Sequence, residues 1–147
     1  MKNKIIFTDI VGMVFILLFT YAAISKLLDY DNFRIEMGKS PLLAGLSNWM
    51  AWALPVLELI IAFILAIPVL KTIGLYMSFT IMVMFTTYLI IVLHFSEYVP
   101  CTCGGLIEKM SWNGHIAFNI LFIILSFFAI LKSPTKKYPI DITASNR

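Results

Sequence analysis

Charge is scarce in this sequence, and long polar stretches are absent before the C-terminal tail. Only 13% of the 147 residues are charged, whereas 61% are hydrophobic. Soluble domains carry about 25% charged residues, so this composition argues against a soluble globular protein and predicts an integral membrane protein. The chain has no room for a second, soluble domain. It also has no basic patch interleaved with aromatic residues, which argues against nucleic-acid binding.

Four apolar segments are long enough to cross a lipid bilayer. A hydrocarbon core of about 30 Å requires roughly 20 apolar residues in a helix, and backbone groups in lipid must be satisfied within the segment. We therefore predict an all-α fold, an integral membrane four-helix bundle occupying residues 1–131, followed by a polar tail at 132–147. The predicted spans are about residues 5–28, 49–70, 72–95 and 114–131.

The lysines and arginines indicate the orientation of these spans. One side of the membrane receives Lys2, Lys4, Lys71, Lys132, Lys136, Lys137 and Arg147, and the other receives Lys26, Arg34, Lys39 and Lys109. The positive-inside rule then places both termini in the cytoplasm. For a bacterial protein, this predicts the inner membrane, with the first and third loops facing the periplasm.

The first outward loop, about residues 29–48, has a pattern of its own. FRIEM and LLAGL alternate apolar and polar residues on either side of Gly38 and Pro41. This pattern predicts a short interfacial helix on each side of that break.

Cysteine is also nearly absent: the chain has two, Cys101 and Cys103, in VPCTCGG. A disulfide between them requires Cα atoms within about 6.8 Å, so the backbone between them must turn. Pro100 and the glycines Gly104 and Gly105 favour such a turn. A disulfide closing so short a loop adds little stability, whereas a strained one is easily reduced. The spacing therefore favours redox or metal chemistry over a structural role.

Two histidines are expected near the same membrane face as the cysteines. His94 ends the third predicted span and His115 begins the fourth. Either side chain could change the protonation of a nearby thiol, and either could be an interfacial histidine without a partner. Because two Cys and two His also suit zinc or copper(I), a metal site of Cys101, Cys103, His94 and His115 stays open as an alternative.

Three polar side chains fall in or beside the apolar spans. Glu58, in PVLELIIAF, is expected near the bilayer centre, where a carboxylate is unfavourable and faces the bundle interior. Lys26, at the outer end of the first span, is a candidate partner, although its expected depth differs by more than a helical turn. Asn119, in the fourth span, is expected to hydrogen-bond across helices.

Several segments together resemble a known family. They are YAAISKLLDYDNF, WALPVLELIIAFIL, CTCGG and SWNGHIAFNILF. The resemblance covers about residues 11–125. In this order and spacing they resemble the MauE branch of the DoxX-like membrane proteins. The chain departs from the family pattern at Gly104, where an aromatic residue is frequent, and at Phe118, where arginine is frequent.

The resemblance implies a four-helix membrane bundle with Cys101 and Cys103 as a redox pair. It also implies a role in maturing the disulfide-rich small subunit of methylamine dehydrogenase, alongside a periplasmic thioredoxin-like partner. The matching family positions outside the pair are Ser25, Lys26, Glu58 and Asn119.

Three hypotheses of function follow. The first is a membrane thiol–disulfide oxidoreductase that takes electrons from a periplasmic thioredoxin-like protein or a client. Its acceptor could be a quinone near Tyr98 and Trp112, and the amides after Cys103 favour that residue as the more acidic thiol. The second is a metal-binding membrane protein using the Cys/His set. The third is a non-catalytic subunit that anchors a larger complex.

Overall fold

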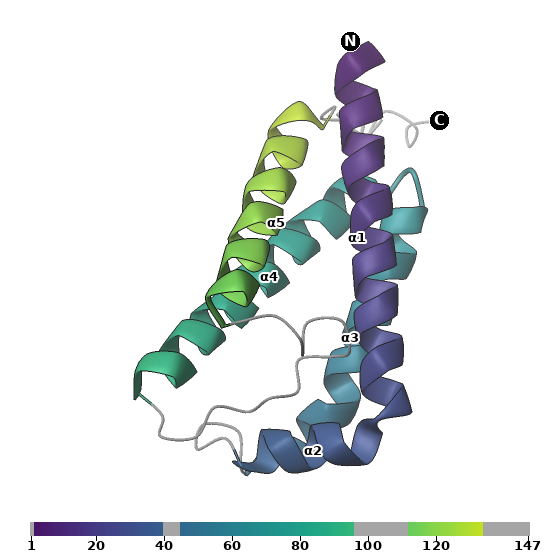
Figure 1. Cartoon of the computed structure of the whole chain (residues 1–147). Helices are drawn as coiled ribbons and strands as arrows, with labels where there is room; N and C mark the ends of the chain where they lie inside the picture. The colour runs from purple at the N-terminus through teal and green to yellow at the C-terminus, as the bar shows by residue number, and fades with distance from the viewer. Residues whose placement is uncertain (1, 40–44, 96–111, 134–147) are drawn as a thin grey trace, which may run out of the picture.

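The computed structural model describes residues 2–39, 45–95 and 112–133, which form five helices (Figure 1). Four helices are long, and a short one crosses one end of the bundle (Figure 1). In chain order they are α1 (Lys2–Leu28), α2 (Tyr30–Lys39), α3 (Ser47–Ala66), α4 (Lys71–Phe95) and α5 (Trp112–Lys132).

The four long helices are apolar enough to cross a membrane. Their spans are Ile6–Leu28, Ser47–Ala66, Lys71–Phe95 and Asn113–Lys132. Each has at least 20 residues, which is the length that a bilayer core requires. Large apolar side chains such as Leu17, Phe63 and Leu121 point outward from them. The chain is therefore a multi-pass membrane protein, and the predicted all-α bundle is confirmed.

The second span is shorter than the sequence predicted. Helix α3 ends at Ala66 rather than near Leu70, and a turn follows in which the Leu70 amide donates to the Ile67 carbonyl. Pro68 explains the early end, because a proline disfavours helical backbone in the residue before it. Ile67 accordingly adopts an extended conformation, with φ −87° and ψ 114°.

The first of the two predicted short helices is present as α2. Its buried residues Phe33 and Met37, one turn apart, pack against Ala51 of α3. The helix continues through Gly38 and ends at Lys39, within the stretch from Gly38 to Pro41 where a break was predicted. The second predicted helix, at LLAGL, falls largely on residues 40–44, which lie outside the described residues.

The core is centred on phenylalanines between α1 and α5. Buried residues recur every three or four positions on each long helix, as expected for helices with one inward face. Phe15 of α1 is fully buried, stacks on Phe19 at a centroid distance of 5.7 Å, and meets Phe122 of α5 edge-on at 5.3 Å. Helix α1 thus packs along both α3 and α5.

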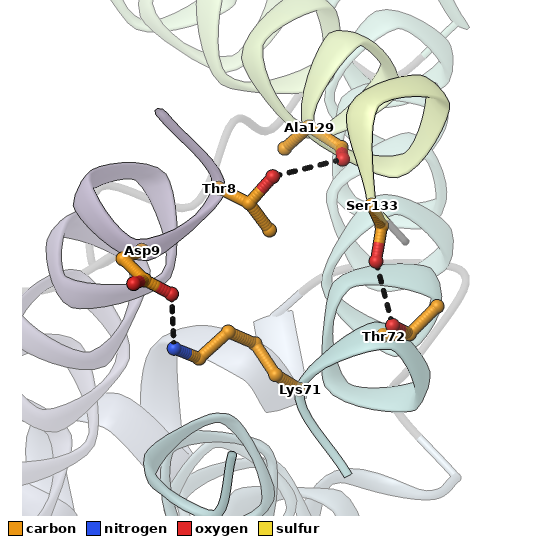
Figure 2. Close-up of polar contacts among 6 residues, drawn as sticks. All are labelled: Thr8, Asp9, Lys71, Thr72, Ala129 and Ser133. Atoms are coloured by element: carbon orange, nitrogen blue, oxygen red, sulfur yellow. Dashed lines mark hydrogen bonds and ion pairs between the residues drawn. The ribbon is translucent and has the colours of Figure 1, made fainter. Parts of the chain in front are cut away.

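Polar contacts tie the bundle together at the end where α1 begins (Figure 2). The Lys71 ammonium lies 2.6 Å from an Asp9 carboxylate oxygen, which joins α4 to α1. The Thr72 and Ser133 hydroxyls are 2.7 Å apart, and Thr8 donates to the Ala129 carbonyl at 3.5 Å. We call this the closed end. At the opposite end α3 and α4 diverge (Figure 1).

Candidate functional site

A buried ion pair lies in the half of the bundle away from the closed end. The Lys26 ammonium of α1 is 2.6 Å from Glu58 Oε1 of α3, and the two side chains are only 6% and 2% exposed. Pairing keeps both charges tolerable in a low-dielectric interior. The candidate partnership between Lys26 and Glu58 is therefore a contact in the structure.

The difference in expected depth is bridged by the side chains. The first turns of α3 pack on α2, through Ala51 against Phe33 and Met37. Lys26, in the last turn of α1, nevertheless contacts Glu58, which lies three turns into α3. The long, flexible stem of Lys26 covers the remaining separation.

The two members of the ion pair differ in how many of their polar groups have hydrogen-bond partners. Lys26 donates to Glu58 and, at a long 3.5 Å, to the Ala22 carbonyl, and its ammonium lies 6.0 Å from the centre of the Phe33 ring. Glu58 Oε2 is buried and has no hydrogen-bond partner among the described residues. A buried acceptor of this kind is uncommon and costs about 1–3 kcal/mol or more when it is charged.

Two further polar residues reach the same region from α5. His115 and Asn119 are one helical turn apart, and both are buried, at 6% and 5% exposure. Their spacing places them on one face of the helix. Phe122, at the next inward position of the same helix, belongs to the core.

Lys26, Glu58, His115 and Asn119 all line one cavity of about 680 Å³. Most of its wall is apolar and comes from all five helices. This volume lies within the range of small-molecule sites, about 300–1,000 Å³. Besides the cysteines, the sequence singled out five polar residues as site candidates, and four of them, from α1, α3 and α5, thus line a single space.

The two histidines are in different surroundings. His94, near the end of α4, is exposed, and its Nδ1 lies 3.0 Å from the Ile90 carbonyl. It does not line the cavity, whereas His115 does. The described part of the chain contains no group of three or more His, Cys, Asp or Glu side chains that could hold a metal ion. Cys101 and Cys103 lie outside the described residues.

The cavity itself was not predicted from the sequence. Its wall contains aromatic and methionine side chains that sequence alone does not distinguish from core residues, among them Phe33, Met50, Phe85 and Phe118. The sequence carries one signal for the cavity. Just before Glu58, Trp49, Ala53 and Leu57 follow one another at helical spacing, and the small Ala53 lies between the two larger residues.

Comparison with protein families assigns the chain to a family. The family model described as methylamine utilisation protein MauE matches residues 4–132. The match includes α2 to α5 completely and all of α1 except its first two residues. The chain belongs to the MauE family. No match was found among curated proteins or among solved structures. The MauE family match covers the ion pair, His115 and Asn119, and it agrees with the resemblance drawn from the sequence motifs.

Proposed function

We propose that this MauE family protein is a membrane thiol–disulfide redox protein that serves methylamine utilisation. Cys101 and Cys103 cycle between dithiol and disulfide and thereby support disulfide formation or electron transfer in a periplasmic thioredoxin-like protein or client. The chain's only two cysteines form this pair. Family membership supports the methylamine role.

The observation that carries the proposal is the position of the buried polar residues relative to the helix ends that flank the cysteine segment. Helix α4 runs away from the closed end to Phe95, and α5 returns from Trp112. Phe95 and Trp112 therefore lie toward the end of the bundle opposite the closed end. Lys26 and His115, which can hold or exchange protons, lie in that same half. Thiol oxidation releases protons, so such groups suit it.

The sidedness of the membrane completes the proposal. The bias in lysine and arginine supports both termini in the cytoplasm of a bacterial inner membrane. The cysteine segment then faces the periplasm, where disulfides persist.

The proposal is tested by the redox state of the two thiols in intact cells. Cells are quenched with acid, and free thiols are alkylated with a mass-tagged maleimide before and after reduction. We expect a mixture of disulfide and dithiol that shifts when the growth medium is made more reducing. The Cys101→Ser and Cys103→Ser single variants are the matched controls, because each retains one thiol that has no intramolecular partner.

Two results would contradict the redox proposal. Thiols that become reactive only after a chelator is added would instead support the metal site. Thiols that are free under every condition, together with normal function of the double serine variant, would support a non-catalytic anchor subunit.

A further inference from the structure

The cavity opens toward lipid between α3 and α4. Trp49 of α3 and Tyr76, Thr80 and Met84 of α4 line the cavity and are exposed, so the cavity is open where these residues lie. The three α4 residues are one turn apart and so lie in a row. Since both helices belong to membrane spans, a molecule can reach the cavity from the bilayer.

The inner part of the cavity has a different chemistry from its mouth. It holds the Lys26–Glu58 pair, His115 and Asn119, whereas the remaining wall is mostly apolar and rich in aromatic and methionine side chains. Glu58 lines this space, and its Oε2 is buried without a hydrogen-bond partner in the described part of the chain. A ligand that donates a hydrogen bond to this oxygen would satisfy it.

The charges in the cavity restrict the ligand's polar group. Lys26 is already paired with Glu58, so a phosphate or carboxylate head group would bring a second negative charge beside Glu58. A cationic head group would meet the Lys26 ammonium. The favoured ligand is therefore neutral, with an O–H donor for Glu58 and an oxygen acceptor for the N–H groups of Lys26, His115 or Asn119.

We propose that this cavity is a binding site for a membrane quinone. Its ring fits the aromatic and methionine wall, its apolar chain leaves through the mouth between α3 and α4, and its hydroxyl in the reduced form donates to Glu58. The site lies inside the bundle rather than at the membrane surface. Glu58 and His115 supply side chains that can exchange protons with the quinone oxygens.

The redox role of the bound quinone rests on the proposed function, and this role makes the quinone the acceptor of the electrons from the two thiols. Two thiols lose two protons and two electrons as one S–S bond forms. The quinone takes up two electrons and two protons, and both of its carbonyl oxygens become hydroxyls. The dithiol is thus oxidised to a disulfide while the quinone is reduced to the quinol, and no other reactant is needed.

Binding is tested with the purified full chain in lipid nanodiscs. Decyl-ubiquinone and its reduced form, decyl-ubiquinol, are titrated separately, and quenching of tryptophan fluorescence is recorded. We expect saturable binding that weakens at least about tenfold in Ala53→Phe, a loss of 1.4 kcal/mol or more. Ala53 lines the cavity between Trp49 and Leu57, so the added ring would occupy the space. Ala117→Phe is the matched control, because Ala117 is exposed on α5 and does not line the cavity.

Further variants and ligands separate the possible outcomes. Equal binding by Ala53→Phe and Ala117→Phe, both with native melting temperatures, would overturn the site. Competition by farnesol or phosphatidylglycerol as effective as that by decyl-ubiquinone would show a general lipid site and overturn the quinone assignment. If Ala53→Phe does not fold, Tyr88→Leu at another lining position replaces it. The Cys101→Ser/Cys103→Ser variant should bind as the wild type does, so failure of thiol cycling is distinguishable from failure of the site.

Discussion

At the scale of single residues, the most unusual feature is an ion pair inside a membrane bundle. Lys26 and Glu58 come from different helices, and both are almost completely buried. A second pair, Lys71 and Asp9, has the same 2.6 Å separation but is 22% and 48% exposed. The two pairs differ mainly in burial, and burial decides how much the loss of one partner matters.

We expect Lys26→Met to lower the free energy of unfolding by about 3–5 kcal/mol, because Glu58 would be left buried without its partner. The double variant Lys26→Met/Glu58→Met removes both charges. Its free energy of unfolding should therefore fall by much less than the sum of the decreases caused by the two single substitutions. Unfolding in mixed detergent micelles, followed by tryptophan fluorescence, measures each value.

The exposed pair is the control for this comparison. Lys71→Met and Asp9→Asn should each lower the free energy of unfolding by only about 0.2–1 kcal/mol, because water can reach these groups. Equal losses at the two pairs would contradict the assignment of Lys26 and Glu58 as a desolvated pair.

At the scale of helices, the turn from α3 to α4 brings the two helices close before they diverge. Gly74 is buried, and a Cβ at this position would lie 2.8 Å from Leu65 Cδ2 and 3.2 Å from the Leu65 amide nitrogen. Leu65 is itself fully buried. The absence of a side chain at Gly74 therefore permits the approach, and the divergence that follows makes room for the cavity.

A larger residue at Gly74 should separate the two helices. We expect Gly74→Leu to lower the free energy of unfolding by about 1–3 kcal/mol through overpacking, as measured by the same micelle titration. Gly45→Leu is the matched control, because a Cβ at Gly45 meets no described atom within 4 Å. If Gly74→Leu lowered the free energy of unfolding no more than Gly45→Leu does, close packing between Gly74 and Leu65 would be unimportant for stability.

At the scale of the whole molecule, the two ends of the bundle differ in chemistry. The closed end holds Asp9–Lys71 and the hydroxyl contacts, whereas the other half contains the cavity and is crossed by α2. The proposed redox function requires the α2 end to face the periplasm.

Sidedness can be measured with single cysteines in the Cys101→Ser/Cys103→Ser background. We expect Arg34→Cys, on the exposed face of α2, to react with a membrane-impermeant maleimide in intact spheroplasts. Val69→Cys, exposed in the turn between α3 and α4, should react only after the membrane is permeabilised. The reverse pattern would place the cysteine segment in the cytoplasm and contradict the proposed function.

Much of the fold was predictable because it depends on apolar length. The four spans follow from runs of apolar residues, but apolar length alone does not show that α3 ends before Pro68. The candidate site was predictable only in part. Glu58 and Lys26 stand out because charge is rare in a span, whereas Phe85 and Met50 are indistinguishable in sequence from core residues.

The sequence by itself determined a helical membrane protein with four spans and a pair of neighbouring cysteines, because a bilayer accepts only long apolar helices and every apolar run is visible in the chain. Only the tertiary structure decided that Lys26 reaches Glu58, that His115 is buried while His94 is exposed, and that these groups share a cavity. Those facts depend on how α3 and α5 are offset along α1 and on how far α4 diverges from α3 (Figure 1). Such offsets arise from packing between helices distant in sequence.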